Sequence, residues 1–354
     1  MMILVINPGS TSTKVAVYED YKELFSENIS HSIDQLGKYK RIVDQKDFRR
    51  ELINDVLKKR DIDDKKLNAV VGRGGLLKPI PSGTYKVNAR MLEDLNSGLQ
   101  GEHASNLGGI LAYDIASPLK IPAFIVDPVV VDELNDTARI TGIAEIKRRS
   151  IFHALNHKYT ARLAAQKLGK EYDDVNLIVA HLGGGISIAA HCKGKVIDVN
   201  NALNGEGPIT PERAGTLPAW DLVELALSGK YSKDELKKMI TGKGGVVALL
   251  GTNDMREVES RVKSGDKDAN LVFEAMAYRI AKEIGSCASV LKGTVDGIVI
   301  TGGFARWKEF IELIKDRISF IGEIFIFPGE NEMEALAAGA MRILKGETEA
   351  ITYN

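Results

Sequence analysis

An α/β fold built from two similar halves is predicted by three patterns in the sequence. Short apolar runs typical of buried strands enter glycine-containing turns four times, after residues 3–6, 70–71, 177–180 and 298–300. In each half the first turn leads into a return strand, so a hairpin precedes the second strand. Two features in the same order favour an internal duplication, and strands alternating with helical segments predict mainly parallel central strands. The alternative is two unrelated α/β domains, because a strand followed by glycine is common.

The remaining elements follow from the periodicity of the apolar residues. Apolar side chains at helical spacing predict helices over about 46–60, around 272–284, around 311–314 and over 334–344. Residues 123–126 form a further apolar strand, and Pro128 shortly after it favours a helix start. The C-terminal helix is expected to pack back on the first half, as duplicated two-lobed folds often require.

Composition excludes several classes of protein. The chain has 354 residues, enough for two domains, and its 44% hydrophobic and 27% charged residues are typical of a globular protein. A formal net charge of -1 gives no reason to expect nucleic acid or an anionic membrane as a partner. No apolar stretch approaches the roughly 20 residues of a membrane span or resembles a signal peptide. A cytoplasmic protein is therefore expected. Its two distant cysteines, Cys192 and Cys287, indicate neither a disulfide framework nor a zinc site.

The glycine turns suggest phosphate binding. Without a Cβ atom in the way, backbone N–H groups can approach phosphate oxygens, and ligand sites of α/β folds lie beyond the carboxyl ends of strands. Each turn alone is weak evidence, because hairpins need glycine and serine for local reasons. Four such turns are more persuasive. Neither GxxxxGK[ST] nor GxGxxG occurs, so P-loop and Rossmann folds are excluded.

Five segments together resemble the acetate and butyrate kinase family. They are Asn7-Pro8-Gly9-Ser10-Thr11-Ser12-Thr13-Lys14, Arg148-Arg149-Ser150-Ile151-Phe152-His153, His181-Leu182-Gly183-Gly184-Gly185-Ile186-Ser187, Thr301-Gly302-Gly303 and Pro328-Gly329-Glu330-Asn331-Glu332. Their order and spacing match the family from residue 7 to residue 332, nearly the whole chain. The resemblance implies the duplicated actin-like (ribonuclease H-like) ATPase fold, with two lobes around a nucleotide cleft. It also implies phosphoryl transfer from ATP, with Mg²⁺, to a carboxylate.

The resemblance implies catalytic roles for three basic residues. Arg73 would bind the substrate carboxylate, Arg213 would face the transferring γ-phosphoryl group, and His153 would donate to the transition state. A carboxylate acceptor is already ionised at pH 7, so it needs cationic groups rather than a general base. A surface salt bridge is the usual role of an arginine, but the glycine neighbours and the motif positions of Arg73 and Arg213 favour a role in the site. His157 is expected to be structural.

The resemblance also implies metal and nucleotide contacts. Asp127 is implied as a catalytic carboxylate that orients Mg²⁺, while Asn7 and Glu332 would hold the ion, largely through water. Contacts to ATP or ADP are implied for Asn7, Ser10, Ser12, Lys14, His181, Gly183, Gly185, Asp254, Arg256, Gly302 and Gly303. The serines could instead be turn formers, and Lys14 could point to solvent.

Butyrate is the predicted acid because of departures from the acetate enzymes' pattern. Gly74 and Gly75 follow the substrate arginine where acetate enzymes have bulky residues. Removing a branched side chain would make room for methylenes, each worth about 0.8 kcal/mol when buried. The length of 354 residues, Gly184 and the segment Gly205-Glu206-Gly207-Pro208 also resemble butyrate kinases. Acetate, propionate, isobutyrate and isovalerate stay open, since the glycines could serve backbone geometry alone.

Two lobes are expected: residues 1–129 with 334–354 on the acid and phosphate side, and residues 130–333 on the adenosine side. A small carboxylic acid is the expected partner, with no nucleic acid and no membrane. Because the family commonly forms symmetric dimers, a homodimer or higher symmetric oligomer is expected. A sugar kinase of the same superfold would need an aspartate base. An actin-like structural or regulatory module without transfer activity is disfavoured by the two arginines and His153.

Overall fold

The computed structural model describes residues 1–354, which form two compact units. Unit 1 comprises Met1–Val131 and Asn331–Asn354, and unit 2 comprises Asp132–Glu330. The C-terminal segment therefore belongs with the N-terminal one. None of the helices combines the length and the apolar character that a membrane crossing needs.

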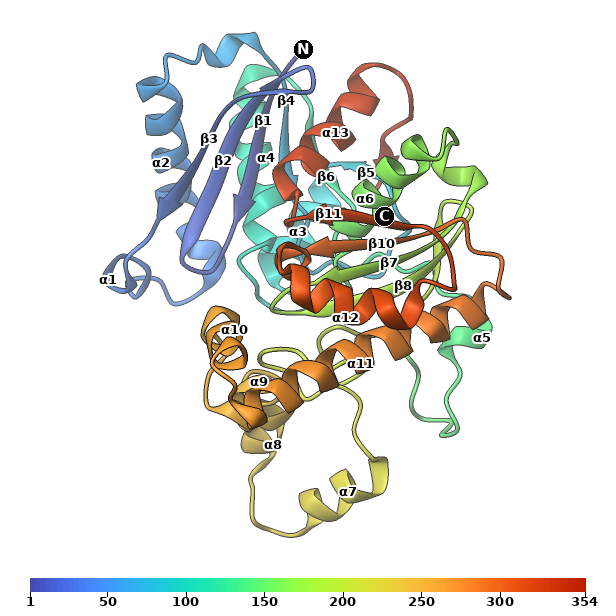
Figure 1. Ribbon diagram of the computed structural model, residues 1–354. Coiled ribbons are helices and arrows are strands. Elements are labelled where there is room, and N and C mark those ends of the chain that lie inside the picture. Colours follow the sequence, from blue (N-terminus) through green and yellow to red (C-terminus); the bar gives the residue numbers. More distant parts are fainter. The chain divides into compact units, whose positions relative to one another are not determined.

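Unit 1 is built on a seven-stranded sheet of order β12-β5-β6-β4-β1-β2-β3. Its strands are β1 (Met2–Pro8), β2 (Ser12–Glu19), β3 (Lys22–Ser30), β4 (Leu67–Arg73), β5 (Thr84–Lys86), β6 (Ala123–Val126) and β12 (Ile351–Thr352). Its helices are α1 (Ile33–Leu36), α2 (Lys46–Lys59), α3 (Ala89–Ser97), α4 (Asn106–Leu119) and α13 (Glu332–Leu344), with 3-10 turns at Ile42–Gln45 and Asp64–Lys66. Figure 1 shows the elements from β1 to β6 in blue and teal, and α13 in red.

The central strands of unit 1 are buried on both faces. Neighbouring residues of a strand point to opposite faces. Ile125 of β6 lies against Gly109 of α4, whereas Val126 lies against Gly339 of α13. The two helices therefore cover opposite faces of the sheet. This arrangement explains why the central strands read as continuous apolar runs rather than as alternating patterns.

Unit 2 is built on a five-stranded sheet of order β11-β10-β7-β8-β9. Its strands are β7 (Asn176–Leu182), β8 (Ile186–Cys192), β9 (Lys195–Val199), β10 (Gly297–Gly302) and β11 (Ile324–Pro328). Its helices are α5 (Asp136–Arg139), α6 (Ala154–Lys167), α7 (Ala219–Leu227), α8 (Lys233–Ile240), α9 (Val246–Leu250), α10 (Met255–Lys263), α11 (Lys267–Val290) and α12 (Lys308–Ile318), with 3-10 turns at Tyr172–Asp174 and Gly303–Arg306.

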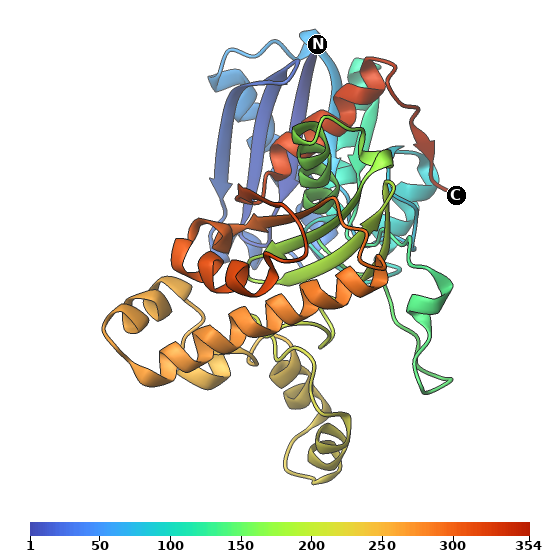
Figure 2. The ribbon, with the colours of Figure 1, turned by 45° about the vertical axis from the view of Figure 1, so that its right-hand side comes forward.

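Helices also cover both faces of the second sheet. Leu177 of β7 belongs to an apolar cluster with Ala161 of α6, whereas its neighbour Ile178 belongs to a cluster with Met276 of α11. Figures 1 and 2 show α11 lying along β7 and β8, with α12 beside it. In both views α7 extends away from this sheet, and none of its residues is buried.

The two sheets repeat one topology. In unit 1 the order β3-β2-β1-β4-β6 contains two antiparallel pairs followed by two parallel pairs. In unit 2 the order β9-β8-β7-β10-β11 contains the same directions in the same sequence. The duplicated α/β fold predicted from the sequence is therefore confirmed.

One predicted element is wrong. No helix begins at Pro128, because the chain makes a single turn, in which Val131 N donates to Pro128 O at 3.0 Å, and Val131 forms a parallel bridge with Ile80. The first helix beyond it is the four-residue α5, which begins at Asp136. A tertiary backbone contact outweighs the local preference of proline for the first turn of a helix. The four predicted helices are found as α2, α11, α12 and α13.

Candidate functional site

The carboxyl ends of β1 and β4 and the start of α13 bring three predicted residues together in unit 1. The parallel pairing of Ile6 with Gly72 makes Asn7 and Arg73 neighbours at the strand ends. Asn7 Nδ2 donates to Glu332 Oε2 at 2.6 Å, and Arg73 Nη1 lies 2.9 Å from Glu332 Oε1. Arg73 Nη1 also lies 3.4 Å from Asn7 Oδ1. Both contacts of Arg73 use Nη1, so the other N–H groups of its guanidinium can bind a carboxylate.

A buried arginine fixes the turn between β1 and β2, which is the predicted phosphate turn. Arg49 is 1% exposed, and its Nη1 donates to Gly9 O and Ser12 O, both at 2.9 Å. The same atom donates to Thr13 Oγ1 at 3.0 Å. Burial lowers the pKa of Arg49 to about 10. The sequence analysis missed this residue, because the residues around Arg49 in the sequence do not indicate that its side chain contacts a hairpin about 40 residues away.

The polar residues of this turn have different environments. Ser10 is exposed and Ser12 is half-buried, and the backbone carbonyl of each accepts from Arg49. Lys14 is exposed and pairs with Asn7 across the hairpin, which places the two side chains on one face of the sheet. The turn-forming interpretation of the serines therefore holds for their backbones. Ligand contacts by the three side chains stay a prediction.

Replacing His31 with glutamine is expected to reduce the loss of stability that accompanies acidification. His31 is buried, its Nε2 lies 2.9 Å from Thr13 Oγ1, and its Nδ1 has no hydrogen-bond partner. Burial first, and the positive charge of Arg49 second, lower its pKa from 6.5 to about 4. Between pH 6.5 and about 4 the unfolded chain binds a proton at this position that the folded chain does not. The free energy of unfolding therefore decreases as the pH is lowered through this range.

Denaturant unfolding at several pH values between 7.5 and 4.5 measures this effect. We expect the wild type to lose about 2–3 kcal/mol more than the His31→Gln variant over that range. His157 and His191, whose pKa values burial also lowers, contribute equally to both proteins and cancel in the comparison. Parallel stability profiles would contradict the prediction.

Asp127 immediately follows β6, beside the end of β4, where Val126 pairs with Arg73. Its Oδ1 accepts from Ser82 Oγ and Gly83 N, both at 2.7 Å. Its φ of 36° lies in the left-handed region, where a non-glycine residue is strained. The side chain thus stabilises the start of β5, and its role in orienting Mg²⁺ stays a prediction.

His103, which the sequence analysis also missed, lies close enough to Arg73 to respond to its charge. Desolvation first, and the guanidinium of Arg73 second, lower the pKa of His103. Its Nδ1 accepts from Ser105 N at 3.2 Å and lies 2.8 Å from Ser105 Oγ. The proton of the neutral ring is therefore on Nε2, so His103 offers a further N–H donor near Arg73.

Gly74 and Gly75 do not create free space. A Cβ atom at Gly74 would lie 2.6 Å from Pro128 Cβ, and one at Gly75 would lie 2.6 Å from Asn106 Cα at the start of α4. Both glycines thus permit close approach of the backbone to neighbouring segments. The inference that their small size enlarges the acyl pocket is therefore wrong.

In unit 2 the hairpin between β7 and β8 gathers the other predicted catalytic residues. The rings of His153 and His181 are stacked, with centroids 3.9 Å apart and an interplanar angle of 14°. A Cβ atom at Gly185 would collide with Arg213 Nη1 and would lie 3.1 Å from His153 Cε1. His153 and Arg213 therefore lie against the same glycine. Arg213 Nη1 also donates to Ala202 O, and burial lowers its pKa.

Asn156, a third residue missed from sequence, fixes the orientation of His181. Its Nδ2 donates to Glu330 O at 2.6 Å and to Thr301 Oγ1 at 3.2 Å, so its Oδ1 faces His181 Nδ1 at 2.8 Å. His181 must therefore carry a proton on Nδ1. The amide is buried, which keeps this arrangement out of competition with water.

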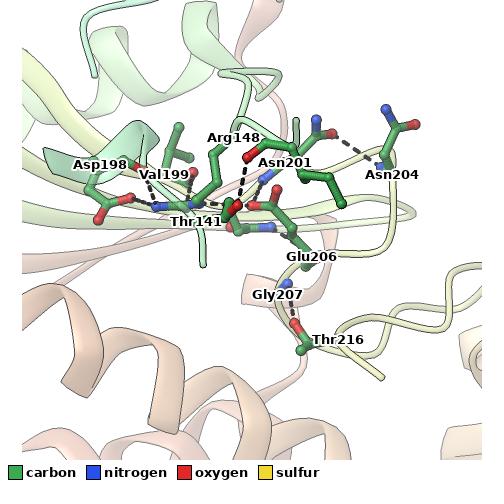
Figure 3. Close-up of polar contacts among 12 residues, drawn as sticks. Thr141, Arg148, Asp198, Val199, Asn201, Asn204, Glu206, Gly207 and Thr216 are labelled. Carbon is green, nitrogen blue, oxygen red and sulfur yellow. Dashed lines mark hydrogen bonds and ion pairs between the residues drawn. The ribbon is translucent and has the colours of Figure 1, made fainter. Parts of the chain in front are cut away.

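Arg148 orders the segment that leads toward Arg213. Its Nη1 donates to Asp198 Oδ1 at 2.8 Å, and its Nε donates to Glu206 Oε2 at 3.3 Å. Glu206 Oε2 also accepts from Asn201 N at 3.0 Å. Figure 3 shows the guanidinium of Arg148 between these carboxylates. The guanidinium of Arg148 thus binds groups of the protein itself. Within the family motif at residues 148–153, this arginine has a structural role.

A cavity of about 700 Å³ in unit 2 contains part of the predicted nucleoside site. Asp254, Arg256 and Gly303 line it, together with Phe304 and Trp307. Hydrogen bonds from Arg256 are the main cause that lowers the pKa of Asp254 to about 2. The indole N–H of Trp307 has no partner in the protein. Aromatic surface with nearby charged groups suits a planar base and a ribose.

Three glycines of the strand-end turns differ in their surroundings. Gly302 and Gly303 are predicted nucleotide contacts, and Gly184 lies between the predicted contacts Gly183 and Gly185. At Gly184 and Gly303 nothing lies within 4 Å of a Cβ position, so a ligand can approach the backbone. At Gly302, where φ is 89°, a Cβ atom would collide with Leu182 O. Gly184 and Gly303 therefore fit a phosphate or ribose contact, whereas Gly302 is required by the packing of β10 beside β7.

Comparison with known proteins assigns the chain. A profile of the acetokinase family matches residues 141–325, a little more than half of the sequence. The chain belongs to the acetokinase family. As an acetokinase it is a carboxylate kinase, and the family resemblance stated from the sequence motifs is confirmed at this level.

Solved structures share the acetokinase fold. Acetate kinase from Porphyromonas gingivalis is 22% identical with a TM-score of 0.82, covering 97% of this chain and 99% of that chain. A propionate kinase from Francisella tularensis is 22% identical with a TM-score of 0.75, covering 96% and 98%. Acetate kinase from Entamoeba histolytica is 17% identical with a TM-score of 0.76, covering 96% and 98%. The expected actin-like ATPase fold is confirmed.

Acetokinases use ATP and a divalent cation, and the residues of unit 1 fit only an indirect role toward the cation. No group of three or more His, Cys, Asp or Glu side chains could hold a metal ion. Both carboxylate oxygens of Glu332 contact Asn7 or Arg73. These residues therefore suit a Mg²⁺ ion carried by nucleotide phosphates and reached through water, because Mg²⁺ dehydrates reluctantly.

Proposed function

We propose that this acetokinase phosphorylates a short-chain carboxylic acid, with butanoate as the preferred acceptor, forming butanoyl phosphate and ADP. The observation that carries the proposal is that cationic groups gather in each unit where the family resemblance implies them. Arg73 lies at the strand ends of unit 1, and Arg213 lies beside His153 in unit 2. Bringing a carboxylate to a triphosphate requires such groups, because both reactants are anions.

The reaction needs no proton transfer. An oxygen of the carboxylate forms a bond to the γ-phosphorus of ATP while the bond from that phosphorus to the bridging oxygen of ADP breaks. Arg73 holds the carboxylate, and Arg213 and His153 donate to the equatorial oxygens of the transferring group. Mg²⁺ bound to the phosphates would reduce their negative charge.

The nucleoside part of the proposal rests on unit 2. Gly303 and Gly184 expose backbone at the cavity that Asp254 and Arg256 also line. Arg256 is 90% exposed, so a ligand can reach its guanidinium. Unit 1 would then supply the acid and phosphate side, and unit 2 the adenosine side. The symmetric homo-oligomer stays a prediction for sedimentation to test.

The preference for butanoate now rests on the length of 354 residues and on the resemblance at Gly184 and at Gly205-Glu206-Gly207-Pro208, since Gly74 and Gly75 add no volume. In that second segment Glu206 binds Arg148, and both glycines have positive φ, so its sequence is also suited to its local backbone. Acetate or propionate is the second candidate, because solved structures that share the fold include acetate and propionate kinases.

Steady-state kinetics with a panel of acids tests the proposal. We expect butanoate or a branched four- to five-carbon acid to give a kcat/KM at least about tenfold above that of acetate, as one or two buried methylenes allow. ADP release and trapping of the acyl phosphate with hydroxylamine measure the reaction. A clear preference for acetate would reject butanoate and keep the carboxylate kinase. No acyl phosphate with any acid would reject the transfer reaction.

A further inference from the structure

A continuous line of hydrogen-bonding groups runs from the protein interior to His153. His153 Nδ1 lies 2.8 Å from Ser187 Oγ, which lies 2.8 Å from His157 Nε2. His157 Nδ1 lies 3.3 Å from His191 Nε2, and His191 Nδ1 lies 2.7 Å from the hydroxyl of Tyr172. All five residues belong to unit 2, and the line connects α6, β8 and the 3-10 turn at Tyr172–Asp174.

The four interior groups of this line are closed to solvent. Ser187, His157 and His191 are each 0% exposed, and Tyr172 is 5% exposed. Desolvation is the largest cause that holds the pKa values of His157 and His191 well below 6.5. Both rings are therefore neutral, and each has one N–H donor and one nitrogen acceptor. A ring that accepts on one nitrogen must donate from the other, so the whole line runs in a single direction.

Relative acidity determines the direction. A phenol is a stronger acid than a neutral imidazole N–H, and an imidazole nitrogen is a stronger base than a phenol oxygen. Tyr172 therefore donates to His191 Nδ1. Arg162 and Lys158 lie over its ring, 4.8 Å and 5.5 Å from the centroid, and their positive charges strengthen the hydroxyl as a donor.

The direction then fixes each later step. His191 donates from Nε2 to His157 Nδ1, and His157 donates from Nε2 to the hydroxyl of Ser187. The Ser187 hydroxyl proton is left for His153 Nδ1. A neutral His153 that accepts on Nδ1 carries its proton on Nε2, the nitrogen on the opposite side of the ring.

We propose that Tyr172, His191, His157 and Ser187 form a one-directional hydrogen-bond relay that holds His153 in the Nε2–H tautomer, ready to donate to the transferring phosphoryl group. The second half of this statement rests on the proposed function. Tyr172, His191, His157 and Ser187 are positioning residues, because they act through His153 and do not contact the reacting atoms. The stacked His181 has the opposite arrangement, since Asn156 requires its proton on Nδ1. Of the two stacked rings, His153 then offers an Nε2–H donor and His181 does not, while both are neutral.

Nitrogen-15 NMR of histidine-labelled protein tests the relay without any substrate, because two-bond proton–nitrogen couplings distinguish the two tautomers of a ring. His153 is assigned from the His153→Gln variant. We expect the wild type to show the Nε2–H tautomer at His153, and Tyr172→Phe, which removes one oxygen, to give a mixture of both tautomers. A proton on Nδ1 of His153 in the wild type would overturn the relay, and so would an unchanged tautomer in Tyr172→Phe.

Kinetics on the same variants tests the connection to catalysis. We expect Tyr172→Phe to lower kcat about three- to tenfold and Ser187→Ala about 10- to 100-fold, with little change in KM for ATP or the acid. Thr160→Val is the matched control, because it removes a different buried hydroxyl, on α6, that bonds to backbone carbonyls and not to the relay side chains. It should change neither the tautomer nor kcat. An altered tautomer with wild-type kcat would overturn the catalytic part of the proposal.

Failure of the relay and failure of the proposed function are distinguishable. If no acid is phosphorylated by the wild type, the proposed function fails while the NMR spectra still test the relay. If acyl phosphate forms and the tautomer of His153 does not depend on Tyr172, the relay fails and the kinase remains.

Discussion

Replacing Arg213 with alanine is expected to lower kcat about 10³-fold or more and to change KM for the acid little. The guanidinium lies against Gly185 beside His153, in partly buried surroundings that lower its pKa but leave it charged at neutral pH. Water therefore weakens only a little the attraction between this guanidinium and the negative charge that builds on the equatorial oxygens during transfer. The measurement is steady-state kinetics with the preferred acid, with circular dichroism to establish that the variant folds.

Two further variants make this result specific. Arg213→Lys keeps a positive charge but has one nitrogen where two are needed, one for Ala202 O and one for the phosphoryl group. We expect its kcat to lie between those of the wild type and the alanine variant. Arg317→Ala, on α12, removes an exposed arginine of the same unit and should leave kcat unchanged. A kcat within threefold of the wild type for Arg213→Ala would remove this residue from the site.

The fold could be predicted from the sequence because its strands are buried on both faces. Continuous apolar runs at 3–6, 70–71, 177–180 and 298–300 are required where helices cover each side of a sheet. The glycine turns that follow them repeat because the two units repeat one topology. The helix expected at Pro128 fails because a local preference cannot report the bridge between Val131 and Ile80.

The candidate site could be predicted where a residue type and a strand end coincide, as at Asn7 and Arg73. It could not be predicted where a contact joins distant segments. The sequence places Arg49 on an ordinary amphipathic helix, and only the fold shows its side chain beneath the turn at Gly9. From the sequence, the absence of a side chain at Gly75 suggests additional space in the pocket. The structure shows instead that Asn106 fills this space, so no side chain would fit at Gly75.

Replacing Arg73 with alanine is expected to raise KM for the acid about 10- to 100-fold, with a much smaller effect on KM for ATP. A charge-assisted hydrogen bond to a carboxylate is worth about 1.5–3 kcal/mol, and Arg73 is expected to bind the acid equally before and during transfer. The variant would also leave Glu332, which is 15% exposed, without its cation. An unpaired carboxylate next to the incoming one would weaken binding further by repulsion.

The double variant Arg73→Ala, Glu332→Gln separates these two causes. The glutamine keeps an acceptor for Asn7 Nδ2 but has no charge, so the repulsion should disappear and KM should fall below that of Arg73→Ala alone. Loss of the direct bond to the acid should keep it above the wild-type value. Arg60→Ala, which removes an exposed ion pair with Glu27 elsewhere in unit 1, controls for the loss of a positive charge. If KM for the acid is unchanged in Arg73→Ala, the ion pair with Glu332 is the whole role of Arg73, and the acid must bind elsewhere.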